Sequence, residues 1–587
     1  MTRDRETRKI AIVGGGPTAL YVLEKLIRSG RRDIAVTIFE RTDRLGAGMP
    51  YSNRGAETEH VTNISWQEMP VWGEQLQTWL KARDLSDVGY GPQEVMPRLL
   101  LGDFLEDTFR ERKSAAEREF AIELKMKTQV RDIEVTSDGF KVVSSSGSFL
   151  YDSLFVCTGH LWPGEEGLTE FFRSPYPPDK LAGIRNHPIA LRGSSLTAID
   201  AIRSLASRHG EFVRSEGKLS YQPAPDCSDF RLVMHTRSGY LPCPRFYFAD
   251  KEFEENGLVD WDEWSRLQKQ NAGFLPLDTI YEKTFKALLK EMGSTVYPKI
   301  KNRSLEEFVK LALASREEQS SFEVFRQEFE QAKKSFRTGH PIVWKEAVSL
   351  FSFVVSYAVK HFSAEDMLRY EEHLQPLAAT VIAFVPPSSA EQILALHEAG
   401  VLELVEVGND SSVEPHPEGG AVYSYQGKEV RYRTFIDCVG QPHLSAREFP
   451  FPSLLKSGVV TSATSKFQER EKGREFQQKN PERTQIDSQD EVYLKLTGVA
   501  INDHFQPLNV DGEPTPNLYL LAIPLIGGHN PDFSGLDVAD TASSIAVEKE
   551  LGSSGPCKEG PEQALEQKFP VPHINSMRKQ PLRDPVG

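Results

Sequence analysis

The sequence predicts an α/β fold with two nucleotide-binding units, on the basis of three patterns. Two stretches, residues 9–39 and 188–236, each run from a short apolar strand through a glycine-containing turn into a helix and on to a second strand. Between residues 246 and 380 the chain changes to long charged stretches with apolar residues three to four positions apart, a spacing typical of helices. We therefore expect two β-α-β units and a helical insertion that splits the second one.

Length and composition limit the classes of protein to consider. The chain has 587 residues, of which 39% are hydrophobic and 26% charged, and this length allows roughly three or four domains that each bury a core. The 84 acidic residues outnumber the 69 basic ones and give a net charge of −15, which argues against a nucleic-acid partner. No stretch approaches a membrane-spanning run of apolar residues and the start is unlike a signal peptide, so we expect a cytoplasmic protein without a membrane partner.

The residues that usually carry metal or nucleophilic chemistry form no recognisable set. The five cysteines are scattered, with no CxxC pair and no cluster with histidine at the spacing of metal ligands, so we expect neither a metal site nor a redox dithiol. No Ser-His-Asp or paired-carboxylate arrangement has a convincing context, and no catalytic residue is assigned. His60, His160 and His529 lie near predicted cofactor turns, where a structural role is the simpler interpretation.

The first unit has the pattern of a dinucleotide-binding turn. Residues 14–19 read Gly-Gly-Gly-Pro-Thr-Ala: Gly14 permits the tight turn, Gly16 lets a pyrophosphate approach the backbone, and Ala19 allows close helix packing. The N-terminus of the helix then faces the phosphates with free N–H groups. Glu40 ends the second strand, where a carboxylate can accept hydrogen bonds from a ribose. The alternative is a glycine-rich turn in an unrelated α/β domain.

The segments that follow favour FAD over NAD in this unit. Gly46 and Gly48 come soon after Glu40, which suits a loop that passes over a second part of a large cofactor. Three further strands are expected at Thr128–Val135, Phe140–Ser144 and Phe149–Val156. The last strand is followed by the turn Thr158-Gly159. Such a turn closes the first half of an FAD-type two-dinucleotide fold, and the alternative is an ordinary loop.

The second unit differs from the first in its turn and in the residue after its second strand. Residues 193–198 read Gly-Ser-Ser-Leu-Thr-Ala, with serine in place of the middle glycine. The strand Phe230–Thr236 is followed by Arg237 and Ser238 instead of an acid. A guanidinium can bind a 2′-phosphate that a carboxylate would repel, so NADPH is favoured over NADH, unless Arg237 is an ordinary surface arginine.

The C-terminal part returns to short β elements from Tyr493 and then to the turn Gly527-Gly528 before a helix expected over residues 534–548. The dipole of that helix would favour negative charge on a reduced flavin ring. Residues 469–490 are strongly polar and are expected to form an exposed loop. The expected organisation is two FAD-binding parts (1–165 and 441–550), two NAD(P)-binding parts (185–245 and 381–440), a helical insertion (246–380) that is a candidate substrate cap, and a flexible tail (551–587).

A set of motifs in a fixed order resembles a known family. The motifs are GGGPTAL, the acid Glu40, GAGMPYS, HVTNIS, MPRLLLGDFL, FVCTGHLWP, RGSSLTAIDA, HTRSG, DCVG and NLYLLA. Together they resemble the two-dinucleotide-binding flavoprotein monooxygenases, and within them the FAD/NAD(P)-binding group that includes bacterial urate hydroxylases and aspartate N-monooxygenases. The resemblance covers residues 8–245 and 380–548, and it implies two Rossmann-like dinucleotide-binding domains, one for FAD and one for NADPH.

The resemblance also implies a set of cofactor contacts. The FAD pyrophosphate would lie on the first glycine turn, the flavin along the next loop, and the NADPH phosphates on the second turn. One departure from the family pattern is Arg192, which stands before the second turn where a hydrophobic residue is usual. The predicted cofactor-binding residues are Gly14, Gly16, Pro17, Thr18, Glu40, Gly48, Met49, Asn63, Arg98, Val130, Thr158, Gly159, Gly193, Ser194, Ser195, Thr197, Arg237, Gly528 and Asn530.

The function that the resemblance implies is an NADPH-dependent FAD monooxygenase. Reduced FAD would combine with dioxygen to form a C4a-hydroperoxyflavin that hydroxylates a small substrate, first of all the nitrogen of an aspartate-like amino acid. Lys299, Lys301 and Arg303 would meet such an acidic substrate if they are not simply solvated. The alternatives are a urate-type ring hydroxylase, an NAD(P)H oxidoreductase that inserts no oxygen, and a redox-sensing nucleotide-binding protein.

Overall fold

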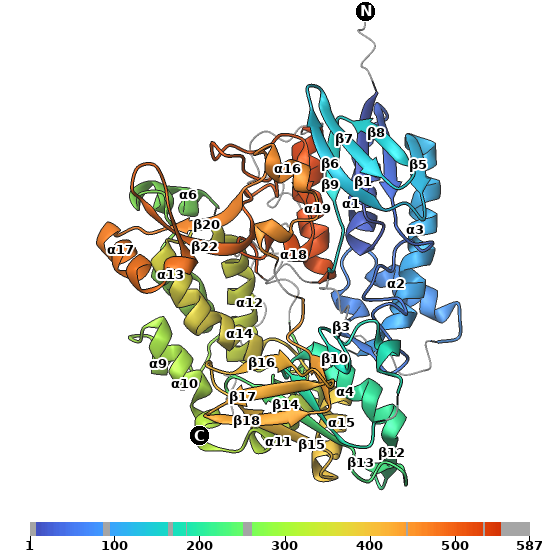
Figure 1. Cartoon of the computed structure of the whole chain (residues 1–587), viewed down its shortest axis with the longest axis vertical. Helices are drawn as coiled ribbons and strands as arrows, with labels where there is room; N and C mark the ends of the chain where they lie inside the picture. The colour runs from blue at the N-terminus through green and yellow to red at the C-terminus, as the bar shows by residue number, and fades with distance from the viewer. Residues whose placement is uncertain are drawn as a thin grey trace, which may run out of the picture.

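The computed structural model of the chain describes residues 7–85, 94–161, 168–183, 185–249, 261–441, 444–531 and 535–552. Figure 1 shows three bodies: one at the upper right that contains both the N-terminal strands and the last helix, one at the bottom, and one on the left made mainly of helices. The tail expected over residues 551–587 lies, from residue 553 on, outside the described residues.

The first body is built on a five-stranded sheet in which all neighbouring strands are parallel. The strand order is β23-β9-β1-β2-β5, so the first strand of the chain lies at the centre and a C-terminal strand at one edge. Because the strands are parallel, their carboxyl ends meet at one edge of the sheet, which is where ligands bind in such folds. The strands are β1 (Arg8–Val13), β2 (Ile34–Phe39), β5 (Ala121–Lys125), β9 (Ser153–Val156) and β23 (Leu518–Leu520).

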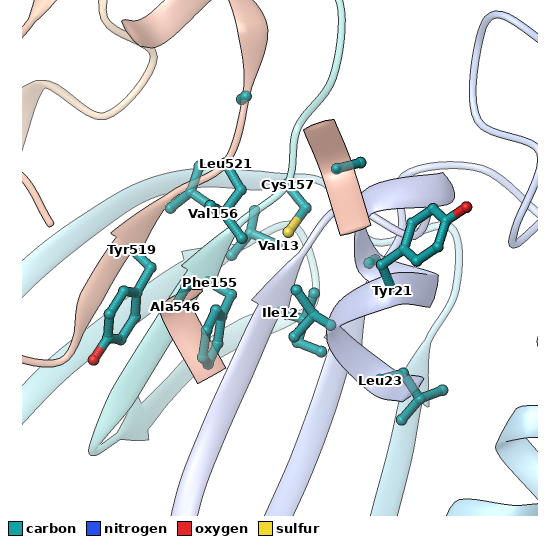
Figure 2. Packing of buried hydrophobic residues seen from close by; sticks show 14 of the residues in the cluster. Ile12, Val13, Tyr21, Leu23, Phe155, Val156, Cys157, Tyr519, Leu521 and Ala546 are labelled. Carbon is teal, nitrogen blue, oxygen red and sulfur yellow. The ribbon is translucent and has the colours of Figure 1, made fainter. Parts of the chain in front are cut away.

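The core of this body joins segments from both ends of the chain. Helix α1 (Pro17–Arg28) begins with a proline, whose fixed φ suits the first helical position, and packs against α19 (Leu536–Leu551). Figure 2 shows the side chains of β1, β9 and β23 gathered in one cluster. Within it the ring of Tyr519 stacks on that of Phe155 with their centroids 4.8 Å apart. The C-terminal segment is therefore an integral part of the first body.

An antiparallel sheet of β6 (Val130–Thr136), β7 (Gly139–Ser144) and β8 (Gly147–Tyr151) lies beside this sheet. The sequence predicted one strand over Phe149–Val156, and this is wrong, because the chain changes sheets at Asp152. There the backbone N–H of Asp152 donates to the carbonyl of Lys9, and the Asp152 carboxylate accepts the N–H of Lys9 at 2.6 Å. The segment thus divides into β8 and β9. Smaller elements of the first body are β3 (Val61–Ser65), α2 (Gly73–Lys81), β4 (Val95–Pro97), α3 (Arg98–Glu119), α16 (Pro452–Lys456) and α18 (Ile523–Ile526).

The second body repeats the plan of the first. Its five-stranded sheet is also entirely parallel, with the order β10-β19-β11-β14-β15. Its main elements are β10 (Phe171–Phe172), β11 (Pro188–Arg192), α4 (Leu196–His209), β14 (Arg231–Thr236), α15 (Pro387–Glu398), β15 (Leu402–Glu406) and β19 (Thr434–Asp437). A hairpin of β12 (Gly210–Ser215) and β13 (Lys218–Pro223) and an antiparallel sheet of β16 (Ser412–Pro415), β17 (Ala421–Tyr425) and β18 (Lys428–Tyr432) are added to it.

The third body is the helical middle domain, which enters between β14 and β15. Most of its helices share a core of their own, whereas Phe322, Phe325 and Phe329 of one helix join the core of the second body. The helices are α6 (Trp261–Gln270), α7 (Leu277–Ile280), α8 (Ala287–Glu291), α9 (Tyr297–Ile300), α10 (Leu305–Glu318), α11 (Ser321–Thr338), α12 (Val343–Ala358), α13 (Ala364–Arg369) and α14 (Gln375–Val381). In the described ranges no single helix is both long and apolar enough to cross a membrane, and only the bent pair α11 and α12, with 93° between them, passes that test of length and composition.

A late segment of the chain also packs against these helices. β20 (Ser462–Lys466), β21 (Thr484–Ile486) and β22 (Val492–Val499) form an antiparallel sheet, and Phe467, Val492 and Leu494 join the core of the middle domain. The sequence predicted an exposed loop over residues 469–490. Most of these residues are exposed, but the loop assignment is wrong, because the segment contains β21 and the helix α17 (Arg470–Lys479). A Cβ on Gly473 would lie 3.0 Å from Cβ of Phe467, so the helix lies close against the sheet despite its polar composition.

Candidate functional site

A cavity of about 970 Å³ lies where the three bodies meet. Its wall includes the turn after β1, the loop after β2, the first residues of α4, the first turn of α19, and one face each of α12 and α14. The carboxyl edge of the first sheet and the N-terminus of α4 in the second body therefore open into one space. This volume is at the upper end of the range for small-molecule sites.

The first glycine turn has a backbone that other residues cannot adopt. Gly14 has a φ of +105°, and a Cβ there would lie 2.2 Å from the carbonyl oxygen of Cys157. The N-cap of α1 is Gly16, which offers no side-chain cap, and the helix starts with Pro17. The free N–H groups of the first helical turn are therefore available to an anionic group in the cavity.

Glu40 lies at the end of β2 and ties two loops together. Its Oε2 accepts the backbone N–H of Gly15 at 2.8 Å, and its Oε1 accepts the N–H of Thr42 at 2.7 Å. The side chain is buried yet lines the cavity. Each carboxylate oxygen can accept a further hydrogen bond, so Glu40 can hold the turn and also bind a ribose hydroxyl.

The second turn repeats the backbone geometry of the first. Gly193 has a φ of +111°, and a Cβ there would lie 2.8 Å from the carbonyl oxygen of Cys438. Its N–H donates to the carbonyl of His235 at 2.8 Å, as that of Gly14 does to the carbonyl of Phe39 at 2.8 Å. The N-cap Ser195 has φ −86° and ψ −169°, and its side chain makes no capping hydrogen bond. The replacement of glycine by serine therefore leaves this helix N-terminus open.

These hydrogen bonds also fix which residues correspond between the two units. Because Phe39 corresponds to His235, the residue that matches Glu40 is Thr236, and Arg237 lies one position further on. The Thr236 hydroxyl is buried and has no hydrogen-bond partner among the residues that the structure describes, and Arg237 is exposed. The second unit thus has no acid where the first has one.

Two arginines near the second unit pair with aspartates. Arg192, the departure from the family pattern, extends from β11 to Asp437 of the neighbouring strand β19, with Nη1 3.3 Å from Oδ2. Arg98 lies at the cavity and donates from Nη1 to Asp200 of α4 at 2.5 Å, and the Tyr176 hydroxyl donates to the same carboxylate at 2.6 Å. Arg98 therefore joins the first body to the second, which the sequence did not predict.

The three histidines differ in position. His60 is buried, with Nε2 2.9 Å from the Ser204 hydroxyl. His529 is buried, with Nδ1 3.2 Å from the backbone nitrogen of Ile501, and does not line the cavity. His160 lines the cavity, and burial lowers its pKa to about 4, so its ring is neutral at pH 7.

The C-terminal turn is displaced from the place that the sequence predicted. Gly528 and Asn530 do not line the cavity, and a Cβ on Gly528 would lie 2.2 Å from the carbonyl oxygen of Thr497. Gly528 is thus packed against β22. The cavity is lined instead by residues 535–539, at the first turn of α19. Gly527 and Gly528 follow the short helix α18, whereas the glycine directly before α19 is Gly535.

The structure brings most of the predicted cofactor-binding residues to one cavity. Those that line it are Gly14, Gly16, Pro17, Thr18, Glu40, Gly48, Met49, Asn63, Arg98, Thr158, Gly159 and Thr197. Those that do not are Val130, Gly193, Ser194, Ser195, Arg237, Gly528 and Asn530. Val130 follows Thr128, whose N–H donates to the carbonyl of Glu40, and the Ser194 hydroxyl donates to the carbonyl of Tyr240.

The helical middle domain supplies a wall of the cavity with residues that sequence reasoning did not name. Ser349, Ser352 and Ser356 of α12 line the cavity, and their spacing of three and four residues puts them on one helical face. That polar stripe in an otherwise apolar helix was a signal in the sequence. Arg245 also lines the cavity; it is fully buried, donates to the carbonyl of Asn63 at 2.6 Å and pairs with Glu68.

The part of the chain that the structure describes contains no set of metal ligands and no pair of redox thiols. No group of three or more His, Cys, Asp or Glu residues there is placed to hold a metal ion. Cys157, Cys227, Cys243 and Cys438 are buried free thiols.

Comparison with protein families identifies the first body. Residues 11–161 match the family model described as FAD-NAD(P)-binding. The chain thus contains an FAD-NAD(P)-binding domain. The residues of this domain fit an FAD: the glycine turn leaves room for a pyrophosphate, and the Thr158 hydroxyl, in the cavity wall, has no protein partner.

Further similarities extend beyond the FAD-NAD(P)-binding domain. Residues 262–382 match the YdhS-like middle domain, and the chain is 26% identical over 465 residues to the uncharacterized protein YdhS of Escherichia coli (strain K12), covering 76% of this chain and 86% of that protein. Among solved structures, the ornithine N-hydroxylase of Kutzneria sp. 744 is 12% identical with a TM-score of 0.45, covering 96% of this chain and 99% of its own. A thioredoxin reductase of T. acidophilum is 9% identical with a TM-score of 0.37, covering 93% and 99%.

Proposed function

We propose that the protein is an NADPH-dependent FAD monooxygenase that hydroxylates a nitrogen of a small amino compound. The observation that carries the proposal is the repeat of one turn geometry in two parallel sheets: the first turn and the residues just after the second turn, Leu196 and Thr197, line one cavity. A fold of this kind can bring two dinucleotides together, and the third wall, from the middle domain, leaves room for a substrate.

Each part of the cavity wall has a role in this proposal. The N-terminus of α1 would bind the FAD pyrophosphate and Glu40 the ribose, while the N-terminus of α4 would bind the phosphates of NADPH. Thr236 in place of an acid, followed by the exposed Arg237, favours NADPH because nothing there repels a 2′-phosphate. When bound, FAD would supply hydride acceptance and the activation of dioxygen.

The protein itself would hold the substrate and exclude water. Phe353 and Phe384 give the cavity wall an apolar surface where they lie. His160 also lines the cavity and is neutral at pH 7, so it can donate or accept a hydrogen bond without adding charge. Aspartate, the substrate that the sequence resemblance suggested, remains a compound to test. Lys301 and Arg303, for which the sequence favoured a solvated surface over contact with such a substrate, are exposed and line a separate pocket of about 380 Å³.

The proposal is tested with purified protein, NADPH and isotope-labelled dioxygen. We expect a yellow protein with bound FAD, oxidation of NADPH, and label in a hydroxylated product when a suitable amine is present. Release of peroxide alone with every amine and purine would show an oxidase, and label in a purine ring would show a urate-type hydroxylase. A colourless protein that takes up no FAD would refute the proposal.

A further inference from the structure

Among the described residues, the middle-domain wall of the cavity carries no charged side chain. Its contributions from α12 and α14 are serine, phenylalanine, glutamine, alanine and isoleucine, and the preceding segment adds Tyr247 and Phe248. The rings of Phe248 and Phe384 meet edge to face with centroids 4.9 Å apart. This wall suits a ligand with an apolar body and a few neutral hydrogen-bonding groups, because an unpaired charge would lose its hydration here.

The cations nearest this wall are already paired. Arg245 pairs with Glu68, and Arg98 with Asp200, so each guanidinium faces a carboxylate within its own ion pair. Arg54 also lines the cavity and is exposed, but it belongs to the loop after β2, in the FAD-NAD(P)-binding domain. The part of the cavity under the middle domain therefore has no spare positive charge among the described residues.

Asp537 is the acid that faces the cavity from α19. Its side chain is accessible in the cavity wall, and no ion pair joins it to a cation in the described parts of the chain. The charged or titratable groups that act on it are Glu68 from the first body and Asp540 from its own helix, and it acts in turn on Tyr21, Tyr51 and Tyr357. Glu68 and Asp540 are themselves paired, with Arg245 and Lys25.

We propose that the cavity accepts a small amine with an apolar body, and that Asp537 binds its protonated nitrogen. This inference rests on the proposed function, because the nitrogen would be the atom that is hydroxylated. A protonated amine has no free electron pair and must first lose its proton. The Asp537 carboxylate takes that proton, so that an ammonium and a carboxylate become a neutral amine and a carboxylic acid.

The surroundings of Asp537 suit this proton transfer. Although the side chain of Asp537 is accessible from the cavity, desolvation inside the cavity and the neighbouring acids raise its pKa, which makes its carboxylate a better proton acceptor than an aspartate in open water. The same surroundings disfavour a dicarboxylate substrate, since its negative groups would lie near Asp537 and Glu68 without a free cation from the middle domain. The structure thus favours an amine without carboxylates over aspartate.

The test measures binding by isothermal titration calorimetry on the full chain, with and without added FAD. The probes are benzylamine, benzyl alcohol, benzoate and aspartate, of which the first three share a ring and differ in charge. We expect benzylamine to bind more tightly than benzoate or aspartate. Asp537→Asn should weaken benzylamine binding about tenfold or more and leave benzyl alcohol unchanged.

A matched control and a pH series complete the test. Asp511→Asn removes an exposed carboxylate that does not line the cavity, and it should leave benzylamine binding unchanged. Wild-type affinity for benzylamine should fall as the pH falls and Asp537 is protonated, whereas the Asp537→Asn variant should lack this dependence. Tighter binding of benzoate or aspartate that is lost in Arg54→Gln, or equal benzylamine binding by wild type and Asp537→Asn, would overturn the inference. FAD retention, followed by visible absorbance, tests the proposed function separately.

Discussion

Replacing Gly14 by alanine tests whether the first turn is as constrained as its geometry indicates. A non-glycine residue at a φ of +105° costs about 1–3 kcal/mol in backbone strain. The added Cβ would also lie 2.2 Å from the carbonyl oxygen of Cys157, and the backbone shift that relieves this contact costs about 1–3 kcal/mol more. We therefore expect Gly14→Ala to destabilise the FAD-NAD(P)-binding domain by about 2–6 kcal/mol.

Gly30→Ala is the matched control for this change. Gly30 has a φ of +65°, but a Cβ there would meet no atom within 4 Å, so only the backbone term applies and the cost is about 1–2 kcal/mol. The assay is the midpoint of thermal unfolding, which moves by about 2–4 °C per kcal/mol for a domain of this size, together with the FAD retained after gel filtration. The reasoning is refuted if Gly14→Ala unfolds at the same temperature as Gly30→Ala and retains as much FAD.

Three further expectations come from charged groups. Arg98→Met should cost about 3–5 kcal/mol in urea unfolding because it leaves Asp200 buried beside Tyr176 without its cation, and the double variant with Asp200→Asn should recover part of that loss; an unchanged single variant would contradict this. Arg237→Gln should raise the KM for NADPH about tenfold and leave that for NADH unchanged in steady-state assays, because only NADPH carries the 2′-phosphate; equal effects on both would assign Arg237 to the solvated surface. Burial lowers the pKa of three histidines to about 4, so unfolding takes up protons below pH 6.5 and stability should fall as the pH drops from 6.5 to 4, with these groups contributing a slope of at most about 4.1 kcal/mol per pH unit. These histidines are His160, His235 and His529. In His235→Gln, the slope of the unfolding free energy against pH should decrease by the contribution of about one proton. An unchanged slope would contradict the assignment.

Sequence reasoning succeeded where short segments determine the structure. The first unit, residues 9–39, could be predicted because its strand, turn and helix are adjacent in the chain and its glycines are required by local backbone geometry. The same holds for the helical spacing between residues 246 and 380, where α10 and α11 form.

The failures have a different cause, since they depend on contacts between distant residues. The break between β8 and β9 depends on Asp152 bonding to Lys9, more than a hundred positions away. α17 is folded against β22 although its own composition is polar, and the cavity uses residues 535–539 although the glycine turn at residue 528 has the stronger pattern. The stripe of serines on α12 could be seen in the sequence, but the surface that it faces could not.

The choice of nucleotide in each unit is set by side chains on a shared backbone. Gly14 and Gly193 make the same hydrogen bond to the neighbouring strand, so the glycine pattern alone cannot distinguish the two sites. The difference lies at the next position of that strand, where Glu40 holds its loop with two backbone hydrogen bonds and Thr236 leaves a buried hydroxyl unpaired. From the sequence alone, Arg237 was matched to Glu40 instead of Thr236, because the predicted end of a strand can be wrong by one residue. The hydrogen bond from Gly193 to His235 removes that ambiguity and matches Thr236 to Glu40. We expect NADPH because residue 236 is not an acid and because an arginine follows it.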